Sequence, residues 1–165
     1  MKKYLIFILL ISVIVFYQSS PISSHVAIKG VSPDFLLVAI SLAAFILGPI
    51  PGQIIGFAVG IIIDIISGGL LGISAFTFSI IGYAVGIVGK KVYGNNILIT
   101  ITILFVVTLL KALILSMLAA IFLKPGYFGY FSQGKIFLEA VLNSLIAPLL
   151  FIIITKIEGR VKRKS

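Results

Sequence analysis

The chain has 165 residues, of which 61% are hydrophobic and only 10% are charged, and its mean hydropathy is +1.31. Soluble domains carry roughly a quarter charged residues, so this composition excludes a soluble globular protein and indicates a single integral membrane domain over residues 1–165. The sequence has no cysteine, which excludes disulfides and thiolate chemistry.

Apolar segments follow one another along the chain, separated by short breaks that mostly contain Pro or Gly. Spans in lipid must satisfy their own backbone hydrogen bonds, and runs of this kind do so as helices. The sequence therefore predicts an all-α membrane protein, a compact bundle of six transmembrane helices with a basic cytoplasmic tail at 156–165. The predicted spans are residues 4–18, 33–47, 52–66, 73–89, 97–123 and 136–155.

The first apolar segment begins after Lys2 and Lys3 and is followed by SSPISSHVA, a pattern that also fits a signal peptide. We favour an uncleaved first span, because a protein with five later spans gains nothing from the loss of its first. Cleavage of this span stays open.

The second and third spans have about 15 residues and would reach only about 22 Å. The hydrocarbon core is roughly 30 Å thick, so the two spans are expected either to extend into GPIPG as a tight cytoplasmic hairpin or to be shielded by neighbouring helices inside the bundle. Asp34 follows Pro33 and is expected in the first turn of the second helix, either as a cap at the membrane interface or as a buried polar group of the bundle.

Glycines recur every fourth residue at the start of the third span, at Gly48, Gly52, Gly56 and Gly60. Glycine lets helix backbones approach closely, and this packing is a main source of helix association in lipid. The pattern predicts a slanted groove, filled either by another helix of the chain or by a helix of a partner. A shorter glycine pattern, GYAVGIVG, occurs in the fourth span.

Asp64 interrupts the apolar run IIIDII near the end of the third span. We expect its carboxylate to be buried and to bond across helices or to cap the turn that follows. That turn is formed by Ser67, Gly68, Gly69 and Gly72.

Two later spans carry further buried polar candidates, Lys111 in the fifth and Glu139 with Asn143 in the sixth. Glu139 and Asn143 lie one turn apart on the same helix face. Ionisable groups inside membranes point inward and tend to pair, so Lys111 is expected to pair with either Asp64 or Glu139. Pro148 is expected to kink the sixth helix.

The distribution of basic residues predicts the orientation, because cytoplasmic segments carry the excess of Lys and Arg. Six spans place both termini on the same side, and that side holds nine basic residues against three on the other. Both termini are therefore predicted to be cytoplasmic. The net charge of +9 is then explained by topology and contact with anionic lipid, without a nucleic-acid partner. The nine are Lys2, Lys3, Lys90, Lys91, Lys156, Arg160, Lys162, Arg163 and Lys164, and the three are Lys29, Lys124 and Lys135.

The residue sets of common enzyme sites are missing from the sequence. It has no Walker loop, no Ser-His-Asp set and no His/Glu metal set, and its single histidine is His25 in the first outer loop. The expectation is a protein without catalytic, cofactor-binding or metal-binding residues. A proton relay through Asp64 and Glu139 stays open.

The chain resembles the family of the rod shape-determining protein MreD from about residue 30 to residue 155. The resemblance is carried by Pro33-Asp34, by GPIPGQIIGFAVGIIIDIISGGLLGISAF, by GYAVG and by LEAVLNSLIAPLLF, which contains Glu139, Asn143 and Pro148. Its most specific part is the set Asp64, Ser67, Gly68, Leu71 and Gly72.

This resemblance implies a non-enzymatic scaffold of the rod complex, or elongasome, in the bacterial inner membrane. Its expected partner is MreC, whose transmembrane helix would dock on the bundle. The MreB cytoskeleton and peptidoglycan synthesis enzymes would belong to the same complex, which maintains rod shape. Self-association stays open.

The substrate-binding subunits of energy-coupling-factor vitamin transporters are the alternative resemblance. They are similar in size and six-helix layout, and they share a pattern like GPIPGQIIGFAVGIIID. The SGGLLG continuation and the helix with Glu139, Asn143 and Pro148 favour MreD.

Overall fold

The computed structural model describes residues 2–18, 30–68, 70–91, 97–122 and 134–162. Within these ranges the chain forms six α-helices and no β-strand, which confirms the predicted all-helical class. The helices are α1 Lys2–Gln18, α2 Phe35–Leu47, α3 Pro49–Ser67, α4 Ile73–Lys91, α5 Ile97–Ile121 and α7 Lys135–Lys162.

The largest differences between the predicted and the observed helix ends are at the start of α3 and the end of α7. Helix α3 begins at Pro49 rather than at Gly52, because proline is tolerated in the first turn, where its missing N–H is not needed. Helix α7 continues to Lys162, so much of the predicted basic tail is helical. His25, Gly69 and the loop at 123–133 lie outside the described residues.

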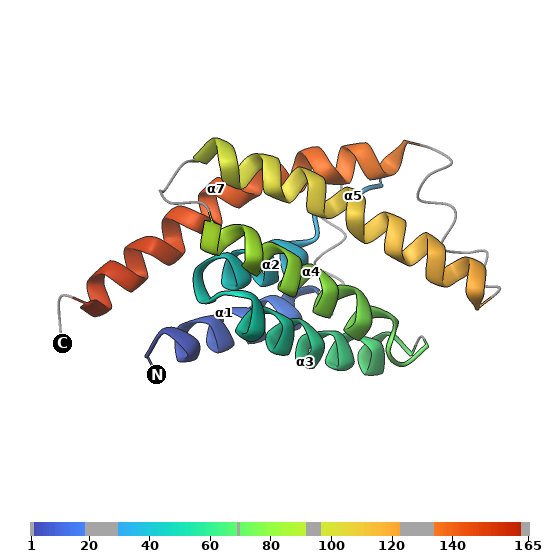
Figure 1. Cartoon of the computed structure of the whole chain (residues 1–165), viewed down its shortest axis with the longest axis horizontal. Coiled ribbons are helices and arrows are strands. Elements are labelled where there is room, and N and C mark those ends of the chain that lie inside the picture. The colour runs from blue at the N-terminus through green and yellow to red at the C-terminus, as the bar shows by residue number, and fades with distance from the viewer. Residues whose placement is uncertain (1, 19–29, 69, 92–96, 123–133, 163–165) are drawn as a thin grey trace.

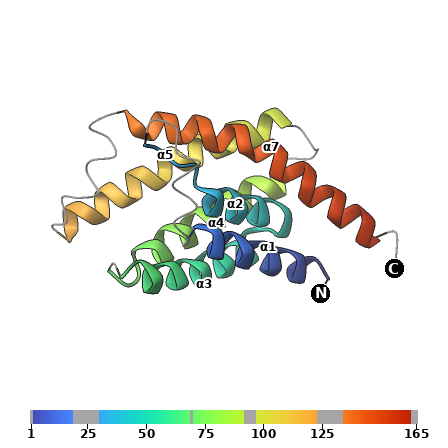
Figure 2. The same ribbon diagram turned by 180° about the vertical axis from the view of Figure 1, so that it is seen from behind.

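Consecutive helices run in alternating directions along the long axis of the bundle, as the colour sequence in Figure 1 shows. Helices α1 and α3 lie at the bottom, α2 and α4 lie above them, and the closely packed pair α5 and α7 lies at the top, also when seen from behind in Figure 2. The N-terminal end of α1 and the C-terminal end of α7 lie at the same end of the bundle. Both views also show α7 bending along its length, and Pro148 lies within this helix.

Helix α2 is the centre of the bundle and contacts each of the other five described helices. Its residues from Leu36 to Ala44 are all buried. A helix of 13 residues is only about 20 Å long, shorter than the hydrocarbon core. It is surrounded by protein rather than lipid, as expected from its length. Helix α3 instead extends into GPIPG to 19 residues and exposes Phe57 and Ile65 on its outer side, so the third span is not enclosed by the bundle.

Gly48 alone connects α2 to α3, because α2 ends at Leu47 and α3 begins at Pro49. The φ angle of Gly48 is +99°, in the region that favours glycine, so this sharp reversal depends on the missing side chain. The reversal brings α3 back alongside α2. It lies at the same end of the bundle as the N-terminal end of α1 (Figure 1).

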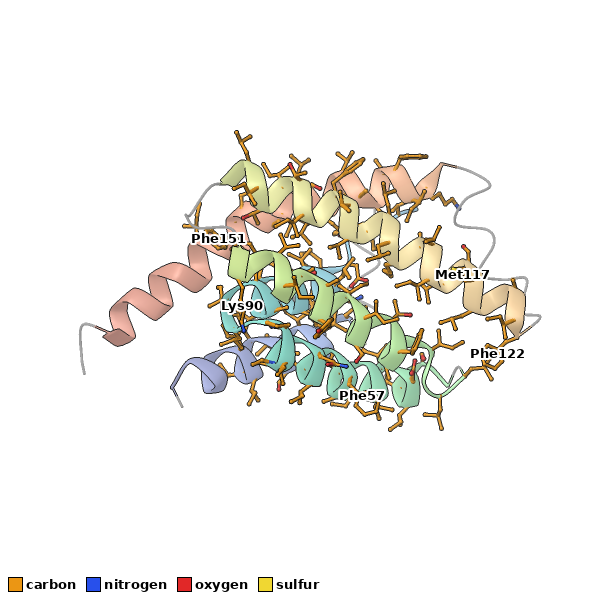
Figure 3. All side chains as sticks on the ribbon, viewed as in Figure 1. Phe57, Lys90, Met117, Phe122 and Phe151 are labelled. Carbon is orange, nitrogen blue, oxygen red and sulfur yellow. The ribbon has the colours of Figure 1, made fainter. Side chains whose placement is uncertain are left out.

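Four described helical segments are long and apolar enough to cross a membrane: Pro49–Ser67, Ile73–Lys90, Leu98–Leu118 and Lys135–Ile152. Large apolar side chains are exposed on the outside of the bundle, among them Phe57, Met117 and Phe122, which Figure 3 labels. An apolar exterior of this extent is suited to lipid and indicates a multi-pass membrane protein. The full count of six spans stays a prediction.

Candidate functional site

An ionic cluster of Asp34, Lys111 and Glu139 joins α2, α5 and α7. The Nζ of Lys111 lies 2.7 Å from Oδ2 of Asp34 and 2.9 Å from Oε1 of Glu139. Asp34 and Glu139 are only 6% and 4% exposed, and 16% of the Lys111 side chain is exposed. Charges this deeply buried are stable only when paired, so the cluster fastens the α5–α7 pair onto the central helix.

Asn143 extends this cluster along α7. Its Oδ1 accepts a hydrogen bond from the backbone N–H of Asp34 at 2.7 Å, and its Nδ2 donates to Oγ1 of Thr108 at 3.1 Å. The Thr108 hydroxyl in turn donates to the carbonyl oxygen of Leu104 at 2.8 Å. Asn143 is fully buried, and these bonds satisfy both ends of its amide.

Gln18 connects the end of α1 to the same cluster. Its Nε2 donates to Oδ1 of Asp34 at 3.2 Å, and its Oε1 accepts from the backbone N–H of Leu36 at 3.2 Å. The ring of Tyr17 packs edge-on against Phe35 with 5.7 Å between centroids. The C-terminal end of α1 is therefore held to the start of α2.

Asp64 bonds to backbone amides at the start of α4. Its Oδ2 accepts from the N–H groups of Gly72 at 2.8 Å and Ala75 at 3.3 Å, and its Oδ1 accepts from Ser74 at 3.0 Å. Asp64 is 3% exposed, so α3 supplies a buried carboxylate cap for the next helix. Lys111 does not pair with Asp64. Its partners among the described carboxylates are Glu139, which was one of the two predicted alternatives, and Asp34.

The turn after Asp64 connects the end of α3 to the start of α4. The Ser67 hydroxyl donates to the carbonyl oxygen of Asp64 at 3.3 Å. Gly68 ends α3 in the left-handed conformation, with φ of +62°, and Gly72 has φ of +100° just before α4. The carboxylate caps the helix beyond the turn rather than the turn itself.

Replacing Asp64 with asparagine is expected to be milder than replacing it with leucine. Asparagine keeps one acceptor oxygen, whereas leucine leaves three amides without their acceptor, at about 1–3 kcal/mol for each buried group. Melting temperature in detergent, followed by size-exclusion chromatography, measures the difference. Equal losses in both variants would show that the negative charge itself is required, and Ser67→Ala is the mild control.

The predicted glycine groove is filled by α4 of the same chain. A Cβ atom on Gly56 would overlap the carbonyl oxygen of Phe78, and one on Gly60 would overlap the backbone of Ala75. A Cβ on Gly52 would lie 2.6 Å from the carbonyl oxygen of Gly82. The backbones of α3 and α4 are thus in direct contact along the ladder, as intrachain packing requires.

Of the two alternatives for this groove, packing within the chain is the one observed, and α4 leaves no space for a partner helix at Gly52, Gly56 and Gly60. Gly48 forms the reversal between α2 and α3 and also lies against α4, because a Cβ there would be 3.2 Å from Cε of Lys90. The glycines of the fourth span complete the packing, because a Cβ on Gly86 would overlap Pro49 and one on Gly89 would overlap Phe45.

A separate apolar groove of about 400 Å³ runs between α1 and α3 on the outer surface. We call it the α1–α3 groove. Ser12 and Ala58 place small side chains in its lining, and the Ser12 hydroxyl is satisfied by the carbonyl oxygen of Ile8 at 2.8 Å. No sequence pattern indicated it, because it depends on how far α1 lies from α3.

No group of three or more His, Cys, Asp or Glu residues in the described part of the chain is arranged to hold a metal ion. The carboxylates of the ionic cluster instead face the ammonium group of Lys111. Sequence reasoning missed Gln18 and Thr108. Thr108 lies one turn before Lys111, a spacing that places both on one helix face.

A bundle of apolar helices with an apolar exterior, whose buried charges are paired inside, defines a multi-pass membrane protein. The model of the family described as rod shape-determining protein MreD matches residues 1–157, and the chain belongs to this family. This is a family of shape-determining structural proteins, which gives the chain a role in rod shape determination. Neither the search of curated proteins nor the search of solved structures gave a match, so the likeness to vitamin transporter subunits has no support.

Proposed function

We propose that the chain is a non-enzymatic scaffold of the cell-wall elongation complex, which binds MreC and links the MreB cytoskeleton to peptidoglycan synthesis. The observation that carries this proposal is the family match over residues 1–157. Within the described residues, the buried charged groups and Asn143 contact one another and the backbone of neighbouring helices, which suits a structural role.

The proposed scaffold crosses the inner membrane six times with both termini in the cytoplasm. The alternating helix directions in Figure 1 support this arrangement, because they bring the N-terminal end of α1 and the C-terminal ends of α4 and α7 to the same end of the bundle. The excess of basic residues at that end favours the cytoplasmic side. The ionic cluster and Asp64 then lie toward the outer side of the membrane.

The transmembrane helix of MreC is proposed to dock in the α1–α3 groove. The opposite face of α3 is covered by α4, whereas this groove is open to the bilayer and apolar. Ser12 and Ala58 are exposed there, and small side chains let a second helix approach closely. Phe16, which is 83% exposed, offers a large apolar contact at the groove edge.

Filling the groove is expected to weaken MreC binding without unfolding the bundle. Ser12→Leu and Ala58→Leu place bulk on exposed positions, so both proteins should melt as the wild type does. Recovery of MreC with the tagged chain from detergent should fall by about tenfold, equivalent to about 1.4 kcal/mol. Val106→Leu adds bulk to the exposed face of α5 and is the matched control. Unchanged recovery in both groove variants would exclude this docking surface.

A further inference from the structure

A second hollow lies on α1 beside the α1–α3 groove. It has a volume of about 490 Å³, and the described residues that line it all belong to α1. We call it the α1 hollow, and it is lined by Ile8, Leu9, Ser12, Val13 and Phe16. Three of these residues, Ile8, Ser12 and Phe16, also line the α1–α3 groove. The groove and the hollow therefore meet on α1 and form one continuous apolar surface.

Ser12 is the low point at which the groove and the hollow meet. Ile8 and Phe16 lie one turn before it and one turn after it on the same face of α1, and they are 60% and 83% exposed. Side chains at every fourth position form a ridge along a helix, and on α1 this ridge is interrupted at Ser12. The Ser12 hydroxyl donates to the carbonyl oxygen of Ile8, so its hydrogen bond is already made within α1.

The α1–α3 groove is too small to hold a whole helix. A helix about 10 Å in diameter fills roughly 1,200 Å³ over three turns, whereas the groove has about 400 Å³. The floor of the groove is closed, because Ile11 and Val59 are buried and belong to the core of the bundle. A docked helix therefore inserts only side chains into the groove, and its backbone rests on the rim that α1 forms. It comes closest to α1 where that rim is lowest, at Ser12.

We propose that the transmembrane helix of MreC crosses α1 at Ser12 and contacts both the α1 hollow and the α1–α3 groove, an inference that rests on the proposed function. The partner helix carries a small residue where it crosses Ser12, because two helix backbones approach closely only where the side chains between them are small. Its large apolar side chains fill the groove beside Ala58. Leu9 and Val13, which line the hollow but not the groove, therefore also belong to the docking surface.

Substitutions at the crossing point distinguish the size of the side chain from its chemistry. Ser12→Ala keeps a small side chain and should leave MreC recovery unchanged. Val13→Trp fills the α1 hollow and should lower MreC recovery by about fivefold, the effect of a contact residue that matters for binding. Val13 is 62% exposed, so this protein should melt as the wild type does, and Leu113→Trp on the exposed face of α5 is the matched control. Normal recovery with Val13→Trp, or a loss with Ser12→Ala, would contradict the crossing.

Site-directed cross-linking in membranes tests the crossing directly, because the chain has no cysteine and each introduced cysteine is unique. Leu9→Cys and Val13→Cys place a thiol-reactive photo-cross-linker in the α1 hollow, and Ile62→Cys places it in the α1–α3 groove. All three variants should form a cross-link to MreC. Leu113→Cys, on the exposed face of α5, is the control and should form none.

The outcomes separate the crossing from the proposed function. A cross-link to MreC from Ile62→Cys alone would overturn the crossing and leave MreC docked in the groove. Cross-links from Leu9→Cys and Val13→Cys to a second copy of the chain in place of MreC would also overturn it. Failure of the proposed function is seen elsewhere, as the absence of MreC when the wild-type chain is purified.

Discussion

Lys111→Met is expected to lower the free energy of unfolding by about 3–5 kcal/mol, the usual cost of removing one partner from a buried ion pair. The ammonium group contacts both Asp34 and Glu139, so its loss leaves two buried carboxylates without a cation. The contact between the α5–α7 pair and α2 should open first. Melting temperature and the monodisperse fraction in detergent measure the effect.

Lys135→Met is the matched control, because Lys135 is exposed at the start of α7 and should tolerate the change. Neutralising the cluster completely should recover part of the loss, so the triple variant with Asp34→Asn and Glu139→Gln is expected to melt above Lys111→Met alone. Equal behaviour of Lys111→Met and Lys135→Met would show that the cluster does not hold the helices together.

Gly56→Leu is the second change with a large expected effect. A Cβ atom there already overlaps the carbonyl oxygen of Phe78, so leucine must push α4 away from α3 along their whole contact. Overpacking commonly costs about 1–3 kcal/mol, and the cost here should exceed that range because backbone rather than a flexible side chain has to move. Gly60→Leu meets the backbone of Ala75 and should behave in the same way. Size-exclusion profiles in detergent should show aggregated rather than monodisperse protein.

Ala58→Leu separates folding from binding on the same helix. Ala58 lies on the exposed side of α3, so its replacement should leave the bundle folded and reduce MreC recovery, whereas Gly56→Leu should lose the fold itself. A Gly56→Leu protein that stays folded and monodisperse would contradict the close packing of α3 against α4.

The sequence predicted the helical class and most helix positions because apolar runs and Pro or Gly breaks act locally. It also predicted the glycine ladder, since the spacing of Gly52, Gly56 and Gly60 follows from one helix. The sequence did not decide whether a helix of a partner or another helix of the chain packs against these glycines. That choice depends on the reversal at Gly48 and the turn at Gly68, which bring α3 and α4 together.

The ionic cluster was only partly predictable for a similar reason. Asp34 and Lys111 are 77 positions apart, and their pairing depends on α5 lying over α2 rather than on any local pattern. Asp34 was interpreted as a helix cap, and it is one, but the same carboxylate also accepts from Lys111. Asp64, in contrast, bonds within eight to eleven positions. A bond across helices was one of its two predicted roles, but the sequence did not indicate that it caps the helix beyond the turn.

Affinity purification of the wild-type chain from detergent-solubilised membranes tests the scaffold most directly. A tag on the chain, with identification of the proteins that remain bound, shows which complex it belongs to. We expect MreC to be recovered with the chain, and its recovery to fall in Ala58→Leu but not in Val106→Leu. Recovery of an ATP-driven transport module in place of MreC would contradict the proposed function.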